Sequence, residues 1–359
     1  MRLIFGAAGS GLICGLVLAG CSPAPAPRSS AHPAAPAPPA PSAALQAINA
    51  AGPPANLGSA SAGAAGPVAP DPAIVRLEVL LDRARFSPGV IDGLGGTNLR
   101  NAVAAYEARA GLAAGDALDP AAWAALTRAA APAAATYVIT PQDVAGPFAP
   151  DVGEDFVKMA ALPGGPLYSS PLEALAERFH MSPGLLAALN PGADFNKAGA
   201  RLTVAATGAA AFAKGDVKRI EVSKGHAQVT AFGADGAVLA VYPATVGSTE
   251  RPSPSGMHKI RGVAWNTDYV YDPAKLDWGP RSHGRFRIKP GPKGPVGVVW
   301  IDLNAPGYGI HGTPDASKIG KTASHGCVRL TNWDAWALAR GVRPGVVVAF
   351  VGERGGEAR

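Results

Sequence analysis

The chain has 359 residues, enough for two or three domains, and a formal net charge of +6 at pH 7. Its 32 Lys and Arg residues form no dense block, which argues against nucleic-acid binding. The hydrophobic content of 48% is ordinary for a globular protein, and much of the proline lies in one early stretch.

The first 20 residues have the plan of a secretory signal. A short basic start precedes an apolar stretch from residue 3 to residue 18, and small residues come directly before Cys21. The ending Leu-Ala-Gly-Cys resembles a bacterial lipobox, which implies cleavage before Cys21 and a lipid on its sulfur. Ser22 resembles the residue that directs lipoproteins to an outer membrane, so we expect a periplasmic, outer-membrane-anchored protein. The alternatives are an ordinary signal peptide with an incidental cysteine and, less favoured because the apolar run is short, a transmembrane helix.

Cysteine usage singles out one thiol. If Cys14 leaves with the signal and Cys21 carries lipid, Cys327 is the only free thiol of the mature chain. Exported proteins usually pair their cysteines, and Cys327 has no partner within the chain. An unpaired cysteine in such a compartment is either buried and inert or chemically used, and this count alone leaves both possibilities open.

Residues 21–70 are predicted to be a disordered tether. Ala, Pro, Ser and Gly dominate the stretch, and Arg28 is its only Lys, Arg, Asp or Glu. As a flexible coil of about 50 residues it would span roughly 35–42 Å, which would let an anchored domain reach away from its membrane.

Residues 71–131 are predicted to form a small three-helix domain. Asp71-Pro72 and Asp119-Pro120 each supply an N-cap followed by proline at the first helical position. Apolar residues at helical spacing follow within 74–81, and a further helix is marked within 99–106. The segment resembles the helical peptidoglycan-binding domain family; the alternative is a generic three-helix module.

Residues 136–206 follow a strand, two helices, strand plan. A strand is expected at 137–139, and Ser170 and Ser182 each cap a helix that begins with proline. An Asn-Pro-Gly turn then leads into a strand at 201–204. The segment resembles a LysM glycan-binding module, although the part before Ser170 departs from that pattern.

Residues 216–352 read as mostly β, because short β-branched runs are separated by Gly and Pro turns. The predicted strands are Val217 to Val222, Ala227 to Phe232, Val238 to Val246, Val296 to Leu303 and Val346 to Val351.

Two histidines accompany the free thiol within this β region, in the segments HGT and SHGCVRL. A thiol needs a nearby base, or a lowered pKa, to act as a nucleophile near neutral pH. His311 and His325 are candidates for that base, and we expect an imidazole close enough to ionise the sulfur. Gly312 and Gly326 allow backbone to approach a substrate closely.

The pattern H-G-T…S-H-G-C-V-R-L resembles the catalytic domain of the YkuD-type L,D-transpeptidase family. The stretches RPSPSGMHKI and IKPGPKGPVGVVWIDL resemble further parts of it, so that the similarity covers residues 216–352. It implies a mainly-β sheet or sandwich with a short helix after the cysteine motif. The implied roles are Cys327 as nucleophile, His311 as base oriented by the Gly312 carbonyl, His325 as a lining residue, and the N–H groups of Gly326 and Cys327 as oxyanion hole. The resemblance also places Arg329, Ser324 and Tyr308 on the substrate side. Arg329 is expected either to steady the loop or to meet a substrate carboxylate, and Ser324 to hold the loop by hydrogen bonding.

The resemblance also implies the reaction. Cys327 would attack the third residue of a peptidoglycan tetrapeptide stem, release D-alanine and pass the acyl group to an amine, without metal or cofactor. Water, a protein lysine or a D-amino acid are alternative acceptors. Two other readings are a zinc site at His311, His325 and Cys327, and a non-catalytic wall-binding lipoprotein. Asp334 is either a triad acid or, as we favour, part of a capping box with Thr331.

Overall fold

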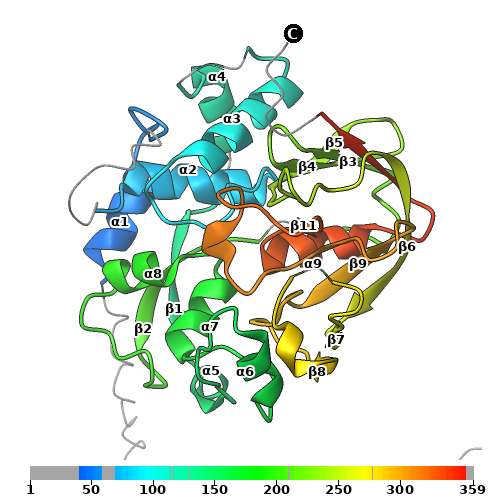
Figure 1. Ribbon diagram of the computed structural model, residues 1–359. Coiled ribbons are helices and arrows are strands. Elements are labelled where there is room, and N and C mark those ends of the chain that lie inside the picture. Colours follow the sequence, from blue (N-terminus) through cyan, green and yellow to red (C-terminus); the bar gives the residue numbers. More distant parts are fainter. Residues whose placement is uncertain are drawn as a thin grey trace, which may run out of the picture. The chain divides into compact units, whose positions relative to one another are not determined.

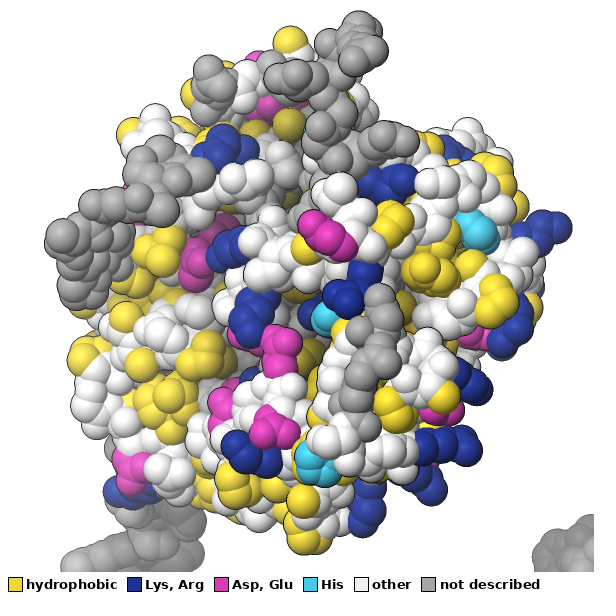
Figure 2. All heavy atoms as spheres, viewed as in Figure 1, with side chains coloured by type: hydrophobic (Ala, Val, Ile, Leu, Met, Phe, Trp, Pro, Cys, Tyr) yellow, Lys and Arg dark blue, Asp and Glu magenta, His cyan; other side chains and the backbone are white. Residues whose placement is uncertain are grey.

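The computed structural model describes residues 40–58 and 69–352, apart from residues 114, 116, 129, 209–210 and 277 (Figure 1). The predicted signal sequence, Cys21 and Ser22 lie outside the described residues. Within the described part of the chain, no helix is both long enough and apolar enough to cross a membrane. On the face drawn in Figure 2, Lys and Arg side chains are scattered among Asp and Glu.

An eight-stranded sheet forms the C-terminal domain, in the order β11-β10-β9-β6-β12-β3-β4-β5. Neighbouring strands are antiparallel except for the parallel pairs β10–β11 and β12–β3. This confirms the predicted mainly-β domain, and helix α9 (Asn332–Gly341) follows the cysteine motif as expected. The strands are β3 (Arg219–Ser223), β4 (Gln228–Phe232), β5 (Val238–Pro243), β6 (Gly256–Trp265), β9 (Val299–Leu303), β10 (Gly309–His311), β11 (Val328–Arg329) and β12 (Val347–Val351).

The sheet is held by side chains that alternate between a buried and a partly exposed face. Ile220 and Val222 of β3, and Val229 of β4, are fully buried in one cluster that also takes in Leu338 of α9. Each such side chain contributes about 1.5–3 kcal/mol when removed from water. The α9 helix is thereby fixed against the sheet next to the strands that carry the cysteine motif.

A separate hairpin leaves the sheet after β6. Strands β7 (Tyr269–Tyr271) and β8 (Phe286–Ile288) pair antiparallel, with the short 3-10 turn η1 (Arg281–His283) between them. A second 3-10 turn, η2 (Ala316–Lys318), lies between β10 and the cysteine motif.

The three helices expected in residues 71–131 are present as α2 (Pro72–Arg83), α3 (Thr97–Arg109) and α4 (Pro120–Thr127). The predicted caps are confirmed, because Asp71 accepts from the Ala73 N–H at 2.8 Å and Asp119 from the Ala121 N–H at 2.6 Å. The helices share a core of their own with Leu57 and with Val241 from strand β5.

The strand, two helices, strand plan of the next module is also present. Strand β1 (Ala134–Val138) pairs antiparallel with β2 (Arg201–Ala205), and α7 (Pro171–Arg178) and α8 (Pro183–Leu189) lie between them in sequence. Two short helices that we did not predict, α5 (Pro141–Ala145) and α6 (Phe156–Ala161), occupy the stretch before Ser170 that departs from the LysM pattern.

The predicted tether is wrong over its described part. Helix α1 (Ala43–Ala50) begins at the N-cap Ser42, whose hydroxyl accepts from the Leu45 N–H at 3.1 Å. Ile48 is only 1% exposed and joins the core of the β1–β2 module. The alanine-rich composition, which has few large apolar residues to form a core, also favours helix. Leu45 and Ile48, which lie one helical turn apart, are enough to dock the helix.

We expect Asn49→Ala to lower the free energy of unfolding by about 2–4 kcal/mol. The Asn49 side chain donates to the Ala134 carbonyl at 3.0 Å and accepts from its N–H at 2.8 Å. Ala134 is 2% exposed, so both backbone groups would be left buried without a partner. Urea unfolding measures the change. Gln46→Ala, at an exposed position of the same helix, is the matched control, and an equal loss in both variants would contradict the assignment.

Candidate active site

Two adjacent strands bring the predicted base and nucleophile to one edge of the sheet. Strand β10 ends at His311, and Cys327 lies immediately before β11. These strands pair in parallel, with Ile310 opposite Val328 and His311 opposite Arg329. The register thus pairs residues eighteen positions apart, so Cys327 lies two residues before Arg329, the sheet partner of His311.

His311 is held in one orientation and one tautomer. Its Nδ1 lies 2.6 Å from the Gly312 carbonyl oxygen, and because a carbonyl only accepts, Nδ1 carries the proton and Nε2 is left as a base. The Trp300 ring stacks on the imidazole with centroids 5.3 Å apart. Burial, and next the charge of Arg329, lower the pKa of His311 to about 3, so the imidazole is neutral at pH 7.

Cys327 is partly exposed, as a nucleophile must be. Its Sγ donates to the carbonyl oxygen of Gly307 at 3.6 Å, and no hydrogen bond joins it to His311 among the described residues. Burial raises the pKa of the Cys327 thiol, against the lowering influence of the Gly309 N–H and of Arg329. The resting site therefore holds a neutral thiol and a neutral imidazole, which differs from the ionised sulfur that we expected.

Ser324 organises the loop around the thiol. Its hydroxyl donates to the Cys327 carbonyl at 2.5 Å and accepts from the Gly326 N–H at 3.1 Å, and the residue is 4% exposed. Ser324 therefore holds the loop by hydrogen bonding, as we expected. One expectation changes, because the Gly326 N–H is already used, which leaves the Cys327 N–H as the oxyanion donor to consider.

Tyr308 lies over the same loop. Gly326 has φ +113°, and a Cβ on it would sit 2.7 Å from Cε1 of the Tyr308 ring. The half-buried tyrosine thus packs on the backbone that presents Cys327, in agreement with its predicted place beside the site. Only glycine allows both this backbone conformation and this contact.

A pocket of about 490 Å³ opens beside the cysteine motif. His325 is exposed there and stacks on Trp278, with ring centroids 4.1 Å apart. Arg329 lines the pocket, and its Nε is buried without a hydrogen-bond partner among the described residues. The lining residues are Glu154, Asp155, Phe156, Trp278, Gly279, Pro280, His325 and Arg329.

The C-terminal domain also matches a known family. Residues 217–349 match the L,D-transpeptidase catalytic domain, YkuD. This part of the chain is an L,D-transpeptidase catalytic domain. Among curated relatives, the L,D-transpeptidase YkuD of Bacillus licheniformis is 44% identical over 70 residues, covering 19% of this chain and 42% of the relative. The L,D-transpeptidase YbiS of Escherichia coli K12 is 30% identical over 124 residues, covering 32% and 38%.

Both matches span less than half of the relative's length. Among solved structures, L,D-transpeptidase 3 of Mycobacterium tuberculosis with a faropenem-derived adduct is 17% identical, with a TM-score of 0.32, over 43% of this chain and 75% of that chain.

Residues from outside the L,D-transpeptidase domain complete the pocket, which sequence reasoning missed. Phe156, at the start of α6, makes edge-to-face contacts with Tyr269, Tyr271 and Trp278, at centroid distances of 5.5, 6.1 and 5.6 Å. Glu154 pairs with Lys318 at 2.7 Å. No sequence motif marks these residues, because only the docking of α6 on the β7–β8 hairpin brings them to the pocket.

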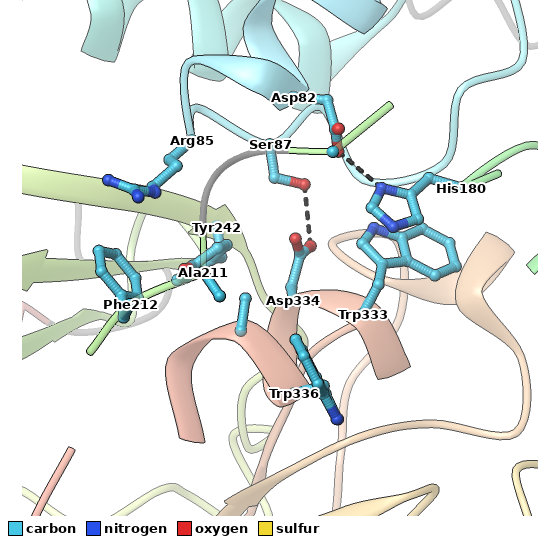
Figure 3. Close-up of a pocket in the computed structure, with 12 residues that line it drawn as sticks. Asp82, Arg85, Ser87, His180, Ala211, Phe212, Tyr242, Trp333, Asp334 and Trp336 are labelled. Atoms are coloured by element: carbon cyan, nitrogen blue, oxygen red, sulfur yellow. Dashed lines mark hydrogen bonds and ion pairs between the residues drawn. The ribbon is translucent and has the colours of Figure 1, made fainter. Parts of the chain in front are cut away.

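Asp334 is not a triad acid. The Thr331 hydroxyl accepts from its N–H at 3.1 Å, which confirms the N-cap half of the predicted capping box. Its carboxylate instead accepts from the Ser87 hydroxyl at 2.8 Å, in a second cavity of about 190 Å³ (Figure 3).

In the described part of the chain, no three His, Cys, Asp or Glu side chains are grouped so as to hold a metal ion.

We expect Gly326→Ala to slow acylation of Cys327 by about 10- to 100-fold. The left-handed backbone costs about 1–2 kcal/mol for alanine, and the clash with Tyr308 must also displace the loop; each 1.4 kcal/mol is a factor of ten in rate. The protein is incubated with a carbapenem, which we expect to acylate Cys327, and mass spectrometry follows the rate at which the drug adduct forms. Gly345→Ala is the matched control, because Gly345 has φ +91° with open space around it and lies away from the site; an equal effect there would count against a local cause.

Proposed function

We propose that the protein is a cysteine-dependent peptidoglycan L,D-transpeptidase. The observation that carries the proposal is the orientation of the His311 imidazole. Its Nδ1 donates to the Gly312 carbonyl, and His311 ends the strand that pairs with the strand directly after Cys327. This arrangement leaves a neutral Nε2 available next to the loop of a partly exposed thiol. The match of residues 217–349 to the L,D-transpeptidase catalytic domain supplies the reaction class.

In the first half-reaction, the Cys327 thiol gives its proton to Nε2 of His311 as sulfur bonds to the carbonyl carbon of the third stem residue. The tetrahedral intermediate then collapses, the peptide C–N bond breaks, and the His311 imidazolium returns the proton to the departing amine of D-alanine. The Cys327 N–H would stabilise the oxyanion, and a thioester remains.

In the second half-reaction, an amine attacks the thioester carbonyl and loses a proton to His311. The C–S bond breaks, and the thiol is restored when it takes that proton back. A stem-peptide amine as acceptor produces a crosslink, whereas water would produce a trimmed tripeptide. Arg329 lines the pocket, and its guanidinium suits a carboxylate of either stem.

The predicted lipid anchor and the predicted peptidoglycan-binding modules are consistent with this function. A lipid on Cys21 would hold the protein in the periplasm at a membrane, with the catalytic domain facing the wall. The helical and LysM-like modules would bind peptidoglycan. Fatty-acid labelling of the protein that disappears in Cys21→Ala tests the first point, and pull-down of the protein by purified peptidoglycan tests the second.

The enzyme assay has two steps. Incubation with a carbapenem should add the mass of the drug, and Cys327→Ala should abolish the adduct. Incubation with tetrapeptide muropeptides should then yield crosslinked dimers with loss of D-alanine. Tripeptide alone would indicate a carboxypeptidase. Neither adduct nor product, with peptidoglycan binding retained, would leave a wall-binding protein without catalysis.

A further inference from the structure

The first turn of α9 is one of the places where the N-terminal modules contact the catalytic domain. Three consecutive residues of this turn each interact with a residue from before the catalytic domain. Figure 3 shows two of these contacts, the stacked rings at a centroid distance of 4.8 Å and the hydroxyl–carboxylate bond of 2.8 Å. The pairs are Asn332 with Glu177, Trp333 with His180, and Asp334 with Ser87.

Asn332, the first residue of that helix, uses its whole amide. Its Oδ1 accepts from the N–H groups of Thr313 at 3.1 Å and Val298 at 3.3 Å. Its Nδ2 donates to a Glu177 carboxylate oxygen at 2.8 Å and to the Pro292 carbonyl at 3.0 Å. The side chain is 5% exposed, so every one of these bonds is made away from water.

The same amide touches the backbone that orients His311. A Cβ on Gly312 would lie only 2.1 Å from Oδ1 of Asn332, so the two are in direct contact. Oδ1 also binds the N–H of Thr313, the residue that follows Gly312. Because the Gly312 carbonyl holds Nδ1 of His311 at 2.6 Å, a shift of this loop would turn the imidazole.

Glu177 lies on α7 of the LysM-like module. It is the residue farthest from His311 in this series of contacts. Burial raises the pKa of Glu177 to about 7, against the lowering influence of Asn332, Lys293 and His180. Either protonation state keeps a carboxyl oxygen that accepts from Nδ2 of Asn332. The link between the modules therefore needs the geometry of Glu177 rather than its charge.

We propose that Asn332 and Glu177 are positioning residues for His311, so that docking of the LysM-like module sets the orientation of the catalytic base. The inference rests on the proposed function for the meaning of that orientation. Its physical content is a hydrogen-bonded path from α7 through the start of α9 to the Gly312–Thr313 backbone.

The test compares four variants of the full chain by the rate constant of the acylation step at saturating carbapenem. We expect a fall of about 100-fold in Asn332→Ala and about 10-fold in Glu177→Ala, because small displacements of a reacting group have effects of this order. Glu177→Gln, which keeps the acceptor oxygen, should restore the rate to within about twofold of wild type. Binding of the drug before acylation should change little.

Glu173→Ala is the matched control. Glu173 is on the same helix and pairs with Lys293 of the catalytic domain at 2.6 Å, but it does not bond Asn332. Loss of this docking contact should leave the acylation step near wild type. An equal fall in Glu173→Ala, or an unchanged rate in a folded Glu177→Ala, would overturn the inference. If Asn332→Ala does not fold, the Glu177 variants decide.

A second readout needs no chemistry at Cys327. The His311 Nδ1 proton, buried and bonded to a carbonyl, should give a downfield imidazole N–H resonance in the wild-type protein and in Glu177→Gln. It should shift or broaden in Glu177→Ala but not in Glu173→Ala. Failure of wild type to form any adduct would count against the proposed function, whereas an unperturbed resonance in Glu177→Ala would count against this inference.

Discussion

Replacing His311 with asparagine should slow acylation of Cys327 by about 10²–10⁴-fold at pH 7, the usual contribution of a general base. Asparagine can still donate to the Gly312 carbonyl, so the buried position keeps its hydrogen bond. What it cannot do is take the thiol proton. Burial raises the pKa of the thiol, so little thiolate is present at pH 7 without that transfer.

The pH profile distinguishes a lost base from a damaged loop. The neutral imidazole persists down to pH about 3, so wild-type acylation by a carbapenem should be nearly flat between pH 5 and pH 8 as far as His311 is concerned. In His311→Asn the rate should rise with pH, because only hydroxide can then remove the thiol proton. A flat, uniformly low profile in the variant would contradict a role as base. Cys327→Ala, which should give no adduct at any pH, is the control.

Acid should destabilise the wild-type fold through the same imidazole. His311 has a pKa of about 3 when folded against an ordinary value of 6.5, so below pH 6.5 the unfolded chain binds a proton that the folded protein does not bind. Stability from this group is present above pH 6.5 and is lost progressively as the pH falls toward 3. The loss between pH 7 and pH 4 should be roughly 3 kcal/mol.

The comparison with His311→Asn isolates this effect. Glu177 and Asp334 have pKa values that burial raises to about 7, so the folded protein gains a proton on each before the unfolded chain does. Those carboxyls stabilise the fold as the pH falls below 7 and oppose His311. Urea unfolding of both proteins at pH 7 and pH 4 should show wild type losing roughly 3 kcal/mol relative to the variant. An identical pH dependence in the two would mean that the imidazole is not buried neutral.

Local chemistry explains why much of the fold was predictable. Helix starts at Asp71, Asp119, Ser170 and Ser182 depend on one capping side chain and a following proline, which act within a single turn. Most long strands of the catalytic sheet show as β-branched runs between turns. Strands β10 and β11 do not, because three- and two-residue strands carry no periodicity and form only when their neighbours are in place.

The tether shows the opposite error. Composition alone suggested that residues 21–70 have nothing to pack, yet α1 docks through Ile48 and through two bonds from Asn49 to one backbone residue. Those partners lie far along the chain, so no local sequence pattern predicts the contacts. Tertiary contacts routinely override such compositional expectations.

By itself, the sequence determined which groups are the candidates for the chemistry. A free thiol, a histidine sixteen positions earlier and glycines beside both are facts of the chain, and the Gly312 carbonyl that orients His311 follows from their family pattern. Only the tertiary structure decided the state and surroundings of those groups. Burial makes thiol and imidazole neutral, Ser324 takes the Gly326 N–H, and helices from another module supply Phe156 to the pocket and Glu177 to Asn332. Desolvation and hydrogen bonding depend on which segments meet in the folded protein, and the spacing of residues along the chain does not predict those meetings.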